Sequence, residues 1–103
     1  MKLYRQGDWV FAEVGKVPEE AKPEKRDSRN RLIIGEGEAT GHAHAVHSKE
    51  ADIMVLDNVR WLLAPEAVDV VHEEHDTIRL PAGTYELRPQ FIYERGQIRK
   101  VLD

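Results

Sequence analysis

Short apolar runs separated by turn signals are the feature that most constrains how this chain can fold. Runs rich in Val, Ile and Leu, such as 53–56, 59–63 and 68–72, are interrupted by Gly, Pro, Asn or Asp. No stretch longer than about ten residues keeps the 3.6-residue apolar period of a helix. The best helix candidate, Ser48–Asp52, is only one turn long. The pattern predicts about eight to ten short antiparallel strands, and therefore an all-β fold, a small single-domain β-barrel or β-sandwich.

The composition fits one domain over 1–103 and excludes several kinds of chemistry. A chain of 103 residues with 41% hydrophobic residues is large enough to bury one core. The chain has no Cys, which excludes a disulfide scaffold, a thiolate metal site and a cysteine nucleophile. Its 15 Lys and Arg against 19 Asp and Glu give a net charge of -4, which makes nucleic acid an unlikely partner.

The N-terminal segment MKLYRQGDWVF lacks the apolar core of a signal peptide. No apolar run approaches the roughly 18 residues that would span a bilayer. We therefore expect a cytoplasmic protein with no membrane partner. Ser28 and Ser48 are the only serines, and neither lies in a Gly-x-Ser-x-Gly elbow, so a serine hydrolase is disfavoured.

A long charged loop is predicted near residues 18–30. The segment contains two prolines and many charges but no large apolar residue. A connection of this length in a small domain is typically mobile or used in binding. Its basic side chains could contact phosphates or an acidic partner, although a solvated loop is the default expectation.

All five histidines fall between positions 42 and 75. On an extended strand, His42 and His44 point to the same side with Cα atoms about 6.5–7 Å apart, so both imidazoles can converge on one ion. His72 and His75 flank a two-residue spacer, where a turn could bring both to the same centre. If the two segments are neighbours, the sequence predicts a divalent-metal site with His42, His44, His72 and His75 as ligands.

The same segments supply one further imidazole and several carboxylates. His47 falls on the opposite phase to His42 and His44, so it is an additional ligand only if the strand bulges or ends before it. A nitrogen and oxygen donor set without sulfur suits Zn, Fe(II), Mn, Ni or Cu. The carboxylates that could ligate the ion, orient an imidazole or act as a base are Glu36, Glu38, Glu73 and Glu74.

Interpretations without a metal stay open. The histidines could form a hydrogen-bonded polar cluster, which would sense pH because neighbouring imidazoles repel one another when protonated. They could also be unrelated surface residues that lie close in sequence.

The strings GEATGHAHAV and VHEEHDTIRLPAGTYELRPQ resemble two blocks shared by a group of short uncharacterised bacterial proteins. The resemblance implies that both histidine-bearing blocks belong to one site. It implies no established activity.

A looser likeness is to cupins, small β-barrels that bind a metal through two sequence motifs. His42 and His44 match the histidine pair of the first motif, and 81–83 matches the Pro-x-Gly turn of the second. Glu86 stands where the last histidine ligand would be, and Gln90 replaces the usual Asn. This likeness implies a metal set of His42, His44 and Glu86.

Two classes of function follow from these observations. The first is a small β-barrel protein with a histidine-rich divalent-metal site. An open coordination position would let the ion polarise a substrate or lower the pKa of a bound water, with Glu73 or Glu74 as the nearest base. The second is a non-catalytic self-assembly or protein-interaction module, for example a homo-oligomer, with a structural or interfacial histidine cluster. The sequence identifies neither a reaction nor a small-molecule ligand.

Overall fold

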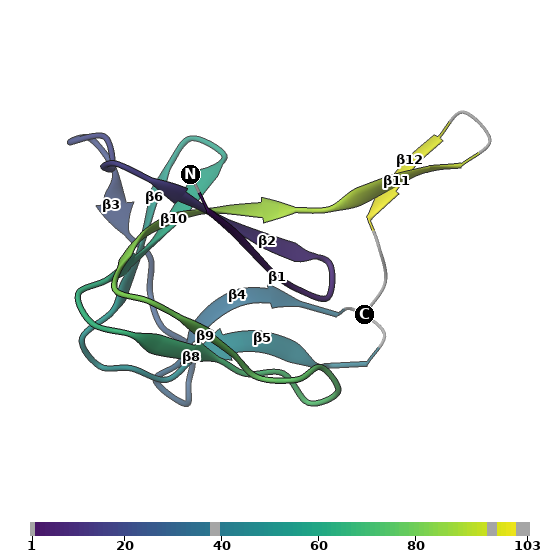
Figure 1. The fold of residues 1–103 in the computed structure, drawn as a ribbon, viewed down its shortest axis with the longest axis horizontal. Helices are drawn as coiled ribbons and strands as arrows, with labels where there is room; N and C mark the ends of the chain where they lie inside the picture. The colour runs from purple at the N-terminus through teal and green to yellow at the C-terminus, as the bar shows by residue number, and fades with distance from the viewer. Residues whose placement is uncertain (1, 38–39, 95–96, 101–103) are drawn as a thin grey trace.

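The computed structural model describes residues 2–37, 40–94 and 97–100, which form short strands joined by turns and loops (Figure 1). All pairings between the described strands are antiparallel. The prediction of an all-β fold of short antiparallel strands is therefore confirmed. The strands are β1 (Leu3–Gln6), β2 (Trp9–Val14), β3 (Lys22–Pro23), β4 (Leu32–Glu36), β5 (Ala43–Val46), β6 (Asp52–Leu56), β7 (Val59–Ala64), β8 (Val68–Val70), β9 (Ile78–Leu80), β10 (Gly83–Pro89), β11 (Phe91–Glu94) and β12 (Gln97–Lys100).

The strands form one large sheet and three small ones. The large sheet has six strands in the order β1-β2-β10-β7-β6-β3, and the two-stranded sheets are β4-β5, β8-β9 and β11-β12. Figure 1 shows β4, β5, β8 and β9 on one side of the large sheet, and β11 and β12 extending away from the other strands. Because the pairings leave separate sheets, the choice between barrel and sandwich stays a prediction. No helix in the described part of the chain is long and apolar enough to cross a membrane.

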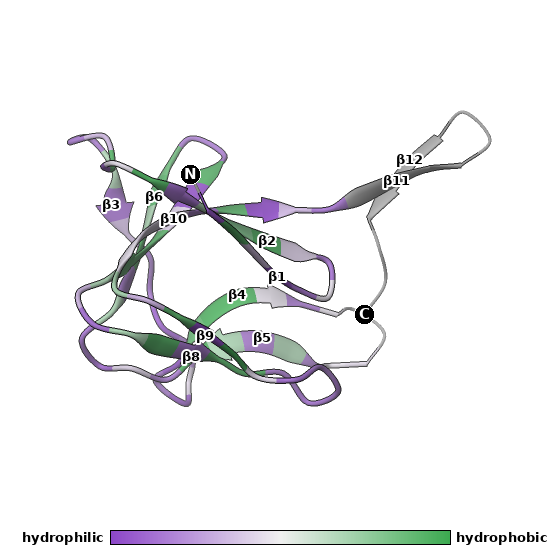
Figure 2. Ribbon diagram, in the orientation of Figure 1, coloured by the Kyte–Doolittle hydropathy of each residue, from purple (hydrophilic) through white to green (hydrophobic). Residues whose placement is uncertain are grey.

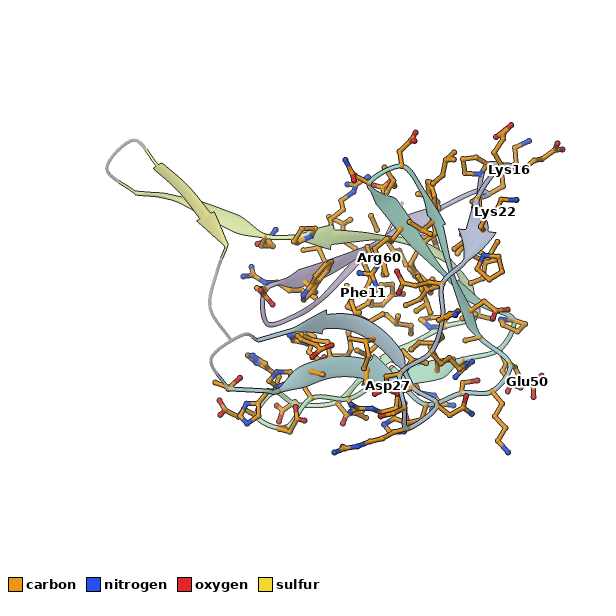
Figure 3. The ribbon with its side chains drawn as sticks, turned by 180° about the vertical axis from the view of Figure 1, so that it is seen from behind. Phe11, Lys16, Lys22, Asp27, Glu50 and Arg60 are labelled. Atoms are coloured by element: carbon orange, nitrogen blue, oxygen red, sulfur yellow. The ribbon has the colours of Figure 1, made fainter. Side chains whose placement is uncertain are left out.

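The core lies between the large sheet and the β4-β5 and β8-β9 sheets. Phe11, Leu62 and Tyr85 are fully buried from the large sheet, and Ile34 and Val70 are fully buried from the small ones. Side chains alternate between two faces of a strand, so a half-buried strand alternates apolar and polar residues. Figure 2 shows the hydrophilic residues gathered mainly in the loops, including the connection between β8 and β9. Figure 3 places Phe11 inside and Lys16, Lys22 and Glu50 at the periphery.

The predicted charged loop is largely tied to the body of the protein. Within it, β3 pairs with β6, with Lys22 opposite Val55. Glu24 accepts two hydrogen bonds of 2.9 and 2.8 Å from the guanidinium of Arg60 on β7. A bidentate pair of this kind fixes geometry as well as charge. The loop is therefore anchored at its centre, which sequence reasoning did not foresee.

Arg26 makes a second anchor for the same loop. Its guanidinium donates hydrogen bonds to three carbonyl oxygens, those of Asn30, Ser48 and Ala51. This contact joins the loop to the segment before β6. That segment includes the helix candidate Ser48–Asp52, which forms a bend that leads into β6 and no helix.

Two tight turns have the backbone that their residues favour. The runs 53–56 and 59–63 are joined by a tight hairpin turn at Asp57–Asn58, because Leu56 pairs with Val59 across it and Asp57 has a φ of 55°. Gly7 lies in the turn between β1 and β2 with a φ of 57°, a conformation that glycine adopts without steric cost. This second turn also carries Asp8, which lies next to the histidines.

Candidate metal centre

A backbone bridge joins the two histidine-bearing segments. Ala45 in β5 and Val71, just after β8, donate hydrogen bonds to each other's carbonyl oxygens, both 2.9 Å long. In an antiparallel pairing, residues on either side of such a bridge also lie opposite one another. Continuing the register outward places His44 opposite His72. The bridge therefore explains why the two segments, distant in sequence, share one site.

Side-chain contacts follow the same register. One step beyond the His44 and His72 pair, the Glu73 carboxylate accepts a hydrogen bond of 2.9 Å from the backbone N–H of Ala43. One step further, His42 Nδ1 lies 3.2 Å from Glu74 Oε1. The contacts extend the alignment beyond the bridge to the start of β5.

His72 lies at the centre of the histidine cluster, which we define as His42, His44, His72 and His75. Its ring centroid is 4.3 Å from that of His44, 4.6 Å from that of His75 and 5.6 Å from that of His42. The rings of His44 and His75 are nearly parallel, with centroids 5.7 Å apart. His44 is 1% exposed, whereas the other three are half-buried. The structure thus brings together all four histidines predicted as ligands.

Two of these histidines and a neighbouring carboxylate have donor atoms close enough together to hold an ion. Single ligand atoms of His42, His72 and Glu73 all lie within 4.8 Å of one another. The pKa of Glu73 is lowered, first by the N–H of Ala43, and to a lesser degree by the charges of His42 and His72. Its carboxylate therefore remains ionised at neutral pH, which is the form that binds a cation.

His44 faces a buried polar pair from the β1-β2 turn. Its Nδ1 lies 2.8 Å from Oε1 of Gln6, and its Nε2 lies 3.3 Å from Oδ1 of Asp8. The Gln6 amide nitrogen donates to the carbonyl oxygens of Val70 and Asp76. Because those two acceptors fix the amide orientation, Oε1 must accept from His44, and Nδ1 of His44 carries a hydrogen.

Sequence reasoning did not find Gln6 and Asp8. They lie more than 30 positions before the first histidine and flank a turn glycine, where polar residues are common. Both are buried, with 3% exposure each. Only the folded chain shows that this turn reaches the histidine cluster, through the contacts of Gln6 and Asp8 with His44.

His72 uses its Nδ1 as an acceptor. The backbone N–H groups of Glu74 and His75 donate to it at 3.0 and 3.3 Å. These bonds close the turn that follows β8. In the neutral ring, the proton is therefore on Nε2.

The remaining predicted residues occupy other positions. His47 follows the end of β5 with an exposed side chain, and Glu36 is exposed at the end of β4. Glu86 lies on β10 in the large sheet and accepts a hydrogen bond from Arg88. Glu74 reaches His42 but is 57% exposed. Glu38 lies outside the described residues.

The fold and the cluster together define a small all-β protein in which histidine and carboxylate side chains converge. The chain belongs to the family described as a domain of unknown function (DUF8820), whose model matches residues 5–90. The matched span contains Gln6, Asp8 and the whole histidine cluster, and it ends before β11. Neither the curated proteins nor the solved structures contain a match to this chain.

Proposed function

We propose that the protein binds a divalent metal ion at the histidine cluster. The observation that carries this proposal is the convergence of His42, His72 and Glu73, whose donor atoms lie within 4.8 Å of one another. Imidazole and carboxylate together suit Zn, Fe(II), Mn, Ni or Cu. His44 and His75 pack against His72 and place two further imidazoles beside this group.

Three protein donors leave a coordination position for water or a substrate. The half-buried setting of His42 and His72 and the exposed setting of Glu73 give such a molecule access. Glu74, whose Oε1 lies 3.2 Å from Nδ1 of His42, is a carboxylate that could take a proton from it. The proposal therefore includes a metal-assisted reaction as one use of the site.

Metal uptake would also alter the turn after β8. An ion bound at Nδ1 of His72 would replace the two backbone N–H groups, and an ion at Nε2 would move the ring proton to Nδ1, which can then no longer accept from them. In both cases the amides of Glu74 and His75 lose their acceptor. Hydrogen exchange at these two amides should therefore become faster when metal is added.

Elemental analysis of the untagged protein, purified without metal-affinity resin, tests the proposal. We expect near-stoichiometric metal, either as purified or after chelator treatment and reconstitution. The double variant His42→Ala/His72→Ala should lose it, whereas His47→Ala should retain it, because His47 lies outside the cluster. A wild-type protein without metal after reconstitution, or a double variant that still binds it, would contradict the proposal.

A second candidate function is self-assembly, with another copy of this chain as the partner. The observation that favours it is the β11-β12 hairpin, which extends away from the other described strands (Figure 1). An isolated two-stranded hairpin is marginally stable in water and gains stability from packing. Light scattering after size exclusion, with and without chelator, would reveal an oligomer and show whether metal lies at its interface. A monomer at all protein concentrations would remove this candidate.

A further inference from the structure

Asp8 places a carboxylate in the interior, beside a buried imidazole. Asp8 is 3% exposed and His44 is 1% exposed. A buried carboxylate is costly unless a positive charge and hydrogen bonds compensate for the lost water. An imidazolium at His44, or a cation bound between the two side chains, would supply such a positive charge.

The hydrogen bond between His44 and Gln6 determines which ring nitrogen of His44 faces the Asp8 carboxylate. Since Nδ1 of His44 donates to Oε1 of Gln6 at 2.8 Å, Nε2 is the nitrogen directed at Asp8. In the neutral ring, Nε2 then carries a lone pair. A histidine that ligates a metal commonly donates its other ring N–H to an oxygen in this way.

The separation of the two atoms fits a shared ion. Nε2 of His44 and Oδ1 of Asp8 are 3.3 Å apart. That is slightly longer than the usual range of about 2.7–3.2 Å for an N–H···O hydrogen bond. Two donors that each lie about 2.0–2.1 Å from a tetrahedral ion are about 3.3–3.4 Å from each other.

The backbone holds Asp8 in place. Gly7 forms the tight turn before it, and the Asp8 carbonyl oxygen accepts a hydrogen bond of 2.7 Å from the N–H of Gln90. The main chain that carries the carboxylate is therefore held on both sides of Asp8. Preorganised donors of this kind are what a metal site requires.

We propose that Asp8 and His44 are metal ligands, through a carboxylate oxygen and Nε2, and that Gln6 is the positioning residue for His44. This inference rests on the proposed metal-binding function and extends the site from the surface group of His42, His72 and Glu73 to a buried pair. The bound ion is a divalent cation that accepts mixed nitrogen and oxygen donors. The Gln-Gly-Asp turn is thereby part of the metal centre.

The test compares Asp8→Asn with Asp69→Asn, which removes the same charge from an exposed residue paired with Arg79. Metal-free protein is titrated with Zn²⁺ in competition with a chromophoric chelator. Asp8→Asn should lose bound metal or bind at least about tenfold more weakly, and Asp69→Asn should match the wild type. Unchanged stoichiometry and affinity in Asp8→Asn would show that His44 and Asp8 form only an ion pair.

A second variant covers the case in which Asp8→Asn does not fold. The protein has no Cys, so Asp8→Cys introduces its only thiol. With Co²⁺ bound, a near-ultraviolet thiolate-to-cobalt charge-transfer band would identify position 8 as a ligand, and Asp69→Cys should show none. Bound Co²⁺ without the band would overturn this inference.

These outcomes separate the two proposals. If the wild type binds no metal, the proposed function fails. If His42→Ala/His72→Ala abolishes binding while both tests at position 8 are negative, the proposed function stands and the role of Asp8 is overturned.

Discussion

The indole of Trp9 lies against the backbone of Gly35, in the space where any other residue would place its Cβ. Gly35 follows an irregularity in the β4-β5 register and is paired with His44. Trp9 in turn follows Asp8 in the chain. The contact therefore sets how closely the β1-β2 turn approaches β5, and with it the distance between Asp8 and His44.

Gly35→Ala tests this close approach. The added methyl group would overlap the indole of Trp9, and overpacking of this kind lowers the free energy of unfolding by about 1–3 kcal/mol. Urea denaturation followed by tryptophan fluorescence measures the change. Gly15→Ala is the matched control, because no atom lies within 4 Å of a Cβ there. Equal stability of the two variants would contradict the prediction.

The bridge between Ala45 and Val71 leads to a second prediction. Val71→Pro removes the N–H that donates to the Ala45 carbonyl oxygen. We expect a loss of about 1–3 kcal/mol in unfolding free energy, because the oxygen loses its partner. Val71→Ala keeps the bridge and should retain more metal in the same binding assay. A proline variant that binds metal as well as the alanine variant would show that the bridge does not align the histidines.

Gln6→Glu should weaken the network that orients His44. A carboxylate can still accept from Nδ1 of His44, but it cannot donate to the carbonyl oxygens of Val70 and Asp76. Leaving buried acceptors unpaired costs about 1–3 kcal/mol. Chemical denaturation should show this loss in Gln6→Glu and little change in Asn58→Asp, which makes the same replacement in an exposed turn. Wild-type stability in Gln6→Glu would rule out a role for the amide donors.

The strands and the histidine cluster could be predicted from the sequence because both depend on local patterns. Alternation in segments such as 68–70 and the Asp57–Asn58 turn indicate strands and a hairpin without any long-range contact. Clustering of the histidines between 42 and 75 likewise pointed to one site.

What the sequence did not indicate depends on pairings between distant segments. Glu24 and Arg60 form an ion pair, and Gln6 contacts His44, only because the fold brings these distant segments together. Neither pair has a fixed spacing that a pattern search could recognise. Glu73 can be distinguished from Glu36 as a candidate metal ligand only from the register beyond the Ala45–Val71 bridge, because that register places the Glu73 carboxylate next to Ala43.

The pH dependence of stability provides a test of Glu73. Its pKa is lowered in the folded protein, chiefly by the Ala43 N–H, so its contribution to stability is present above the carboxyl pKa of the unfolded chain. That contribution is lost as the pH falls through the lower, folded pKa. Glu73→Gln keeps an oxygen for Ala43 but has no charge to titrate. In metal-free protein, the stability difference between wild type and Glu73→Gln should therefore shrink between about pH 5 and pH 3.

Urea denaturation of chelator-treated protein across this pH range measures the difference. Glu74→Gln is the control, because it removes the same charge from the neighbouring, exposed position. At neutral pH, Glu73→Gln should also bind metal at least about tenfold more weakly than Glu74→Gln, since Glu73 belongs to the converging donor group. A stability difference that grows on acidification would mean that the ionised carboxylate is unfavourable in the folded state, and Glu73 would then be a poor candidate for a cation ligand.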